Sequence, residues 1–214
     1  MEIKFDNIIL RDPKESDIDD EIRWNTTETE WALWDAPWEM EEWLPTFDPV
    51  KFRTEELEAL KKPVRGFRWG MEVDTSGGVH VGSVNTYLID ESYEWIPLKN
   101  VEEGQRIFYT LGIEINEPAY WDQGIGTKAL AAYIQYHLDN GHYDICLQTW
   151  SGNTRMVRCA KKLGFQICER EVGKRNVRGG LYDGLTFCLD VRRFHVRYPS
   201  PGIIFGPSPE ETCL

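Results

Sequence analysis

The sequence contains no apolar run that approaches the ~20 consecutive residues needed by a membrane-spanning helix. Residues 1–6 have neither the basic start nor the apolar stretch of a signal peptide. The five cysteines are an odd number with no Cys-x-x-Cys pair, which argues against a zinc ribbon and against a disulfide framework. These absences predict a cytoplasmic protein with reduced thiols, no membrane partner and no metal site.

Positive charge is also scarce. Lys and Arg number 24 against 36 Asp and Glu, which gives a net charge of −12. Because phosphate contacts rely on a surplus of Lys and Arg, we expect no nucleic-acid partner. The charge is uneven: residues 15–42 contain eleven acids and one base, whereas residues 151–197 contain eleven bases and four acids. One segment should attract cations and the other anions, unless both are simply solvated helix faces.

What is present suits one globular domain. The chain has 214 residues, of which 41% are hydrophobic and 28% charged, and a domain of this size buries roughly 70% of the surface that its unfolded chain exposes. We expect a single domain over residues 1–197, followed by a Pro- and Gly-rich tail over residues 198–214. No helix or strand is expected in the tail, although the apolar triplet 203–205 could dock on the domain or on a neighbouring molecule.

The pattern of apolar residues and turn signals predicts an α+β fold. A mostly antiparallel central sheet should be flanked by helices, with one strand–helix–strand–helix unit in its second half. Residues 90–105 are polar and are expected to form an excursion from the sheet. The expected strands are residues 8–10, 67–73, 79–89, 107–115, 143–150, 165–171 and 181–191. The expected helices are parts of 15–42, then 54–62, 127–140 and 154–163.

The most informative segment is a glycine turn between a strand and a helix. Gly124 and Gly126 allow the backbone to approach a ligand and leave N–H groups free at the start of the following helix. These donors and the helix dipole suit a phosphate or pyrophosphate, although a tight turn without a ligand has the same pattern. With Ala129 the spacing also matches a dinucleotide fingerprint. That motif should follow its strand directly, but residues 116–123 come between the strand and the turn. It should also lead to an acidic residue at the end of the next strand, but residues 148–150 contain none. Both departures weaken the hypothesis of a nucleotide-binding oxidoreductase.

Several motifs together resemble those of the GNAT superfamily of acyl-CoA-dependent N-acetyltransferases, in particular the branch that contains the ribosomal-protein alanine N-acetyltransferases. The resemblance is firm over residues 108–189. It rests on a strand over 111–115, Pro118, the turn Trp-Asp-Gln-Gly-Ile-Gly-Thr-Lys over 121–128, Asn153, and Lys-Leu-Gly-Phe over 162–165. No single motif is specific, but the combination is.

The resemblance implies that acetyl-CoA is the acyl donor and lies in a V-shaped wedge between the fourth and fifth strands, residues 107–115 and 143–150. Backbone groups of Ile113 and Ile115 would pair with the pantetheine amides. Asn153 would bond the arm of the cofactor, unless it only caps a helix, and Arg158 could reach a CoA phosphate. The pyrophosphate would be held by Gln123, Gly124, Ile125, Gly126 and Thr127.

The implied reaction is direct transfer of the acetyl group to an amine. Because an ordinary alkyl amine is mostly protonated at pH 7, a base or a water chain is useful, and Glu114 on the cofactor strand is the candidate. The chain has Ala160 where many GNAT enzymes have a tyrosine acid, and Met156 where the alanine acetyltransferases tend to have a serine. The general acid is therefore unassigned. These departures keep open a second possibility, a non-catalytic acyl-CoA-binding or regulatory module.

The acceptor site is expected in the acidic, tryptophan-rich segment. Carboxylates beside indole rings favour a cation through charge and cation–π contacts, although aromatic residues at this spacing also form cores. We expect the primary amine of a cationic small molecule or of a peptide or protein N-terminus as the acceptor, and a possible homodimer. The candidate acceptor residues are Glu30, Trp31, Trp34, Asp35 and Trp38.

Overall fold

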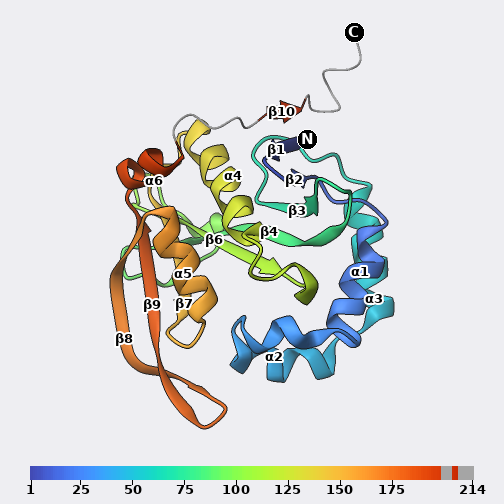
Figure 1. The fold of residues 1–214 in the computed structure, drawn as a ribbon, viewed down its shortest axis with the longest axis horizontal. Helices are drawn as coiled ribbons and strands as arrows, with labels where there is room; N and C mark the ends of the chain where they lie inside the picture. The colour runs from blue at the N-terminus through green and yellow to red at the C-terminus, as the bar shows by residue number, and fades with distance from the viewer. Residues whose placement is uncertain (199–203, 207–214) are drawn as a thin grey trace.

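A computed structural model describes residues 1–198 and 204–206. Its strands form one sheet in the order β10-β1-β2-β3-β4-β6-β7-β9-β8, with β5 paired to β4 (Figure 1). All pairings are antiparallel except that of β6 with β7. The strands are β1 (Glu2–Phe5), β2 (Ile8–Arg11), β3 (Gly70–Thr75), β4 (His80–Ile89), β5 (Trp95–Ile96), β6 (Phe108–Ile115), β7 (Ile145–Trp150), β8 (Phe165–Val177), β9 (Gly180–Leu189) and β10 (Ile204–Gly206).

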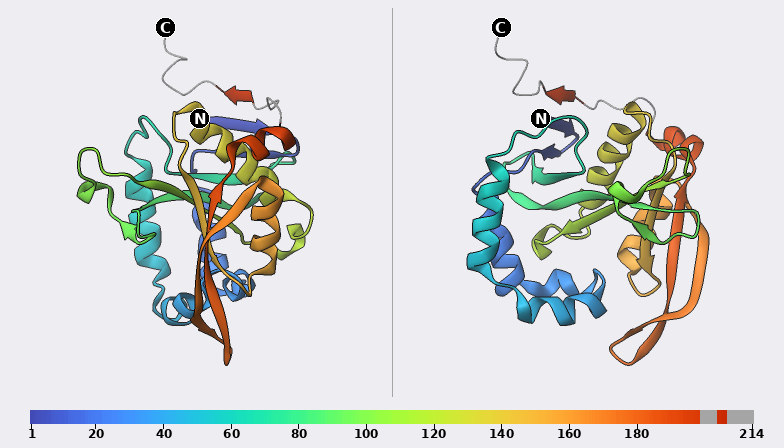
Figure 2. Two further views of the ribbon diagram at one scale, coloured as in Figure 1. Left: turned by 90° about the vertical axis from the view of Figure 1, so that its left-hand side faces the viewer. Right: turned by 180° about the vertical axis from the view of Figure 1, so that it is seen from behind.

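Helices lie on both sides of this sheet. The α1 and α3 helices run side by side, and α2 lies beneath the ends of β6 and β7 (Figures 1 and 2). In the described part of the chain, no helix is both long and apolar enough to cross a membrane. The helices are α1 (Asp17–Thr26), α2 (Pro37–Trp43), α3 (Pro49–Leu60), α4 (Ile125–Asp139), α5 (Thr154–Leu163) and α6 (Val191–Arg197), with short 3₁₀ turns η1 (Thr29–Leu33), η2 (Leu44–Thr46), η3 (Leu98–Asn100) and η4 (Pro118–Tyr120).

The α3 helix corrects one prediction. It begins at Pro49 rather than at residue 54. The carboxylate of Asp48 accepts hydrogen bonds from the backbone N–H groups of Val50 (3.0 Å) and Lys51 (3.1 Å). Pro49 fits the first turn because the N–H groups there have no partner within the helix, so the N–H that proline lacks is not missed. The start signal is therefore the cap Asp48 followed by Pro49, six residues ahead of the expected cap at Thr54.

Several strands also differ from the prediction. The β3 strand begins at residue 70 rather than 67, and the two-residue strand β5 lies inside the expected excursion over residues 90–105. The short strand β1 was not expected, and β8 continues past residue 171 to Val177, with a register shift against β9 after residue 171. The β9 strand ends at Leu189, since the side chain of Asp190 caps α6. The expectation of no strand in the tail is wrong for β10, which pairs with β1 and so places that segment on the sheet. Residues 199–203 and 207–214 of the tail lie outside the described part.

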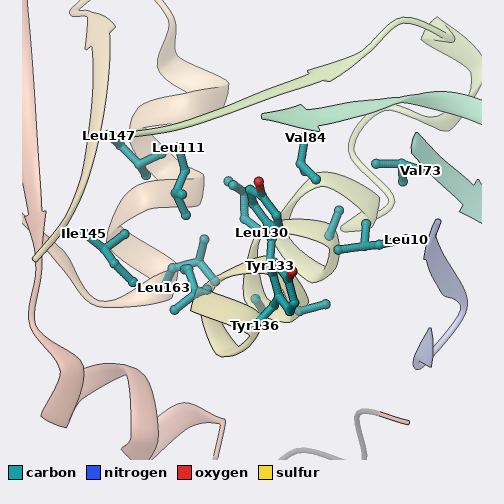
Figure 3. Close-up of a cluster of buried hydrophobic side chains, with 14 of the residues drawn as sticks. Leu10, Val73, Val84, Leu111, Leu130, Tyr133, Tyr136, Ile145, Leu147 and Leu163 are labelled. Carbon is teal, nitrogen blue, oxygen red and sulfur yellow. The ribbon is translucent and has the colours of Figure 1, made fainter. Parts of the chain in front are cut away.

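The α4 helix supplies the core that holds the sheet together. Leu130, Tyr133 and Ile134 are fully buried against the sheet (Figure 3). The Tyr133 hydroxyl donates to the backbone carbonyl of Arg68 at 2.8 Å, so even its polar atom is satisfied. The helix is thereby fixed against β2, β4 and β6, and its N-terminus is held beside the end of β6.

The sheet opens between β6 and β7. The β6 strand pairs with β4 along its whole length, from Phe108 to Ile115. With β7 it pairs only at Tyr109↔Ile145 and Thr110↔Cys146, after which the two strands part. These are the strands predicted over 107–115 and 143–150, so the expected α+β fold is confirmed and the structure has the expected wedge between them.

Candidate active site

A pocket of about 260 Å³ occupies this wedge. It is bounded by β6, the first turn of α4, α5, the end of β7 and the segment that joins η1 to α2. Twelve of the predicted site residues line it: Trp31, Trp34, Asp35, Ile113, Glu114, Ile115, Gly124, Ile125, Gly126, Thr127, Asn153 and Arg158. The structure thus brings together most of the cofactor candidates, the candidate base and part of the acceptor segment.

The backbone of β6 presents its free side to the pocket. Alternate residues of a strand point their N–H and C=O groups in opposite directions. Tyr109 N–H bonds toward β7 (to the Asp144 carbonyl, 2.8 Å), and Asn116 N–H bonds toward β4 (to the Val81 carbonyl, 2.9 Å). By this alternation Ile113 and Ile115 face the wedge. The carbonyl of Ile115 there accepts the indole N–H of Trp121 at 2.6 Å.

The glycine turn is open. Gly124 has φ +79°, and a Cβ added to it would meet nothing within 4 Å. It is the N-cap of α4 and no side chain caps the helix, so the first N–H groups of α4 keep no side-chain partner. Gln123 behaves differently: its side-chain amide donates to the Ala119 carbonyl at 2.6 Å, and it does not line the pocket.

Asn153 uses both ends of its amide within the protein. Its Oδ1 accepts the Met156 N–H at 3.0 Å and caps α5, while its Nδ2 donates to the Trp34 carbonyl at 3.0 Å. The same carbonyl accepts the indole N–H of Trp150 at 2.8 Å. The acceptor segment is therefore tied to the β7 side of the wedge by two hydrogen bonds.

Arg155 is a pocket residue that the sequence reading missed. Its guanidinium carbon lies 4.5 Å from the ring centroid of Trp34 and 4.4 Å from that of Trp121. Its Nη2 is 3.5 Å from a carboxylate oxygen of Asp122, and its buried Nη1 has no hydrogen-bond partner among the described residues. Helical spacing could have revealed it, because Arg155, Arg158 and Lys162 recur along the face of α5 that lines the pocket.

The pocket is acidic at its other end. Burial and then the charge of Asp35 raise the pKa of Glu114 to about 8, against an opposing hydrogen bond from Asn116. Burial and then Glu39 raise the pKa of Asp35 to about 6. Two carboxyl groups that disfavour each other's charge are suited to receive a proton or a cation.

The remaining acceptor candidates are dispersed. Trp31 is buried and donates its indole N–H to the Trp24 carbonyl at 2.9 Å, so it also belongs to a small core. Trp38 lies outside the pocket, with the guanidinium carbon of Arg175 at 4.2 Å from its ring centroid. Glu30 is exposed and does not line the pocket. Trp34 and Asp35 line the pocket together with the predicted base, and the charge of Asp35 acts on Glu114.

A sheet that opens beside a glycine turn at the start of a long buried helix defines an acetyltransferase type of fold. A family profile described as the acetyltransferase (GNAT) domain matches residues 7–166. The chain belongs to this family, and the expected class of enzyme, an acyl-CoA-dependent N-acetyltransferase, is confirmed. A search of curated proteins found no match.

Solved structures agree with this fold at low sequence identity. A GNAT-family acetyltransferase from Bacillus anthracis has a TM-score of 0.61 at 14% identity, with 88% of this chain and 98% of that chain covered. RimL, a ribosomal L7/L12 alpha-N-protein acetyltransferase in complex with CoA, has a TM-score of 0.62 at 13% identity (88% and 97% covered). A spermidine N-acetyltransferase SpeG chimera from Vibrio cholerae and hSSAT has a TM-score of 0.59 at 12% identity (90% and 100% covered). The likeness to RimL accords with the branch that the motifs indicated.

Proposed function

We propose that the protein transfers an acetyl group from acetyl-CoA directly to a primary amine, and that residues 1–197 form the catalytic domain. The observation that carries this proposal is one continuous pocket with a basic, glycine-lined end and an acidic end. The first end suits a pyrophosphate and the second a cationic amine. The thioester would lie between them, beside β6.

The donor would be held mainly by the backbone. N–H groups at Gly124, Gly126 and Thr127 would bond the pyrophosphate, and Ile113 and Ile115 would pair with the pantetheine amides as a further strand would. Gln123 contributes only its backbone here, since its side chain is turned to Ala119. Arg158 and the unpartnered Nη1 of Arg155 supply positive charge from α5.

In the transfer itself, Glu114 accepts a proton from the ammonium or from the attacking amine. The amine nitrogen bonds to the thioester carbonyl carbon, the C–S bond breaks, and the thiolate takes a proton. Ala160 is buried and has no proton to give, so water is the proposed source of that proton. A raised pKa suits Glu114 to hold a proton near neutral pH and to exchange it during turnover.

The acceptor class follows from the acidic end. Of the two carboxyl groups there, Asp35, with a pKa of about 6, is more readily ionised than Glu114 and favours a cationic amine. Trp34 lines the same pocket, although Arg155 already lies over its ring. Two of the structural neighbours, a spermidine N-acetyltransferase chimera and a ribosomal-protein alpha-N-acetyltransferase, act on cationic amines. We therefore propose a cationic small molecule or a peptide N-terminus.

The test is release of free CoA from acetyl-CoA with a panel of amines that includes diamines, polyamines and short peptides with free N-termini. The expected result is turnover with at least one cationic amine and none with its N-acetylated form. Binding of acetyl-CoA without turnover across the panel would favour the second candidate function, a non-catalytic acyl-CoA-binding module. Ala160 and Met156, which stand where related enzymes have a tyrosine and a serine, are the reason for testing it. No binding at all would refute both.

A further inference from the structure

Three cysteines from three neighbouring strands meet away from the acetyl-transfer pocket. Cys146 of β7 and Cys188 of β9 are directly opposite each other in the antiparallel pair, and their sulfur atoms are 3.4 Å apart. Directly opposite residues of such a pair have Cα atoms about 4.5–5.5 Å apart, which lies within the usual span of a disulfide. Cys168 of β8 lies on the other side of β9 and completes the group. None of the three lines the acetyl-transfer pocket.

The thiols run from the interior to the surface. Cys146 is fully buried, Cys188 is partly buried, and Cys168 is exposed. A second, shallow hollow on the surface is lined by both Cys168 and Cys188. A small oxidant can therefore reach Cys188 from solvent, whereas Cys146, on the neighbouring strand β7, is buried in the sheet.

The surroundings of Cys188 favour its thiolate. The Cys146 thiol, whose sulfur is 3.4 Å away, lowers the pKa of Cys188 against the opposing effect of burial, and the charge of Arg106 acts in the same direction. Arg106 itself is held by Asp144 at 3.1 Å. A thiolate is the nucleophilic form of cysteine.

We propose that Cys188 and Cys146 form a thiol oxidation site at which a hydroperoxide is reduced and a cross-strand disulfide is made. The Cys188 thiolate attacks the nearer peroxide oxygen, so that an S–O bond forms, the O–O bond breaks, and the leaving hydroxide or alkoxide takes a proton from water. The Cys146 sulfur then attacks the sulfenic sulfur, the S–O bond breaks, and water leaves with the proton of Cys146. Two thiols are oxidised and one peroxide is reduced to water and an alcohol, or to two waters.

The decisive experiment treats the reduced full-length chain, with Cys213→Ser in all samples, with hydrogen peroxide and maps its peptides by mass spectrometry. A Cys146–Cys188 cross-link, with the loss of two hydrogen atoms from the intact mass, is the expected product. Cys168→Ser and the matched control Cys159→Ser should retain it. The double variant Cys146→Ser/Cys168→Ser, which leaves no neighbouring thiol, should instead stop at a sulfenic acid on Cys188 that a dimedone probe captures. A Cys168–Cys188 cross-link, or no cross-link, would overturn the proposal.

A second measurement tests the thiolate without relying on the disulfide. Iodoacetamide should alkylate Cys188 about tenfold faster than Cys159 at pH 7, because burial raises the pKa of the Cys159 thiol. The rate at Cys188 should level off at a lower pH than the rate at Cys159. Cys146→Ala removes the thiol that lies 3.4 Å from the Cys188 sulfur and should move this inflection to higher pH. Equal alkylation rates at Cys188 and Cys159 in the unsubstituted protein would contradict the proposal, whatever the variants show.

Discussion

The carbonyl oxygen of Trp34 accepts a hydrogen bond from Nδ2 of Asn153 at 3.0 Å, although 119 residues separate the two in sequence. The other end of the same amide caps α5. One side chain therefore fixes both the start of a helix on the proposed donor side and the position of the proposed acceptor segment.

Asn153→Asp separates these two roles. A carboxylate still caps α5, but it cannot donate to Trp34 and would repel that carbonyl. We expect a loss of about 1–3 kcal/mol of stability, because a buried hydrogen bond is broken, and an acceptor KM raised about tenfold. Asn153→Ala, which also removes the cap, should cost about 1 kcal/mol of stability in addition. An unchanged acceptor KM in both variants would show that the tie to Trp34 does not position the acceptor.

Glu114 should govern the pH dependence of turnover. Its pKa is raised to about 8, so the ionised base is lost as the pH falls through that value. With a weakly basic acceptor that stays neutral, kcat/KM should fall about tenfold per pH unit below this inflection. Glu114→Gln should lower kcat by about 10²-fold or more and leave acetyl-CoA affinity intact.

Asp35→Asn provides the electrostatic control for this profile. Its negative charge raises the pKa of Glu114, so its removal should move the inflection to lower pH. A profile that stays in place would mean that another group supplies the base.

Gly124→Val tests the phosphate-binding turn. At φ +79° a side chain costs about 1–2 kcal/mol of stability, and the added methyl groups would cover the N–H groups of the turn. We expect acetyl-CoA affinity to fall at least about tenfold, as measured by calorimetry. Gly141→Val is the matched control: it has φ +81° and the same open surroundings, but lies at the far end of α4. It should lose similar stability and keep its affinity; similar affinity in both variants would contradict the assignment.

Glu21 should make the protein less stable as the pH rises. Burial and then the charges of Glu72 and Glu56 raise its pKa to about 8. An acid whose pKa is raised in the folded state binds a proton more tightly in the native protein than in the unfolded chain. The free energy of unfolding therefore decreases as the pH rises from about 4.5, the ordinary pKa of the group, to about 8, its pKa in the folded protein. Glu21→Gln should therefore raise the free energy of unfolding by about 1–3 kcal/mol at pH 8, and change it little at pH 4. The exposed control Glu103→Gln should have no such pH-dependent effect in denaturant titrations.

Local signals in the sequence were enough for β6, α4, β7 and α5. The apolar face of α4, the stop at Gly164 and the β-branched run of β6 all act over a few residues, and the predicted elements match there. The sequence does not predict α6, whose first residue falls in an expected strand. The β1 and β10 strands have only four and three residues and form by pairing with neighbouring strands, β1 with both β2 and β10, so neither carries a local pattern strong enough to be predicted from its own residues. Asp48–Pro49 was a readable cap that the expectation of a later start passed over.

The candidate site divides in the same way. The glycine turn lies within one segment and could be recognised from spacing. The sandwich of Arg155 between Trp34 and Trp121 depends on three segments that only the folded chain brings together. Proximity in sequence predicts that Trp38 lies in the acceptor site with Trp34. The chain instead turns at Ala36, which adopts a left-handed conformation, and α2 begins at Pro37. Trp38 therefore lies outside the pocket, beside Arg175.

The early parting of β6 from β7 has a consequence for how such a protein can diverge. Under the proposed binding mode, recognition of the donor depends on main-chain atoms, which every amino acid supplies alike. Side chains along this edge are then free to vary, provided that the curvature of the strand and the bend ahead of α4 persist. Shape can thus outlast sequence, as it does between this chain and neighbours that share only 12–14% of its residues.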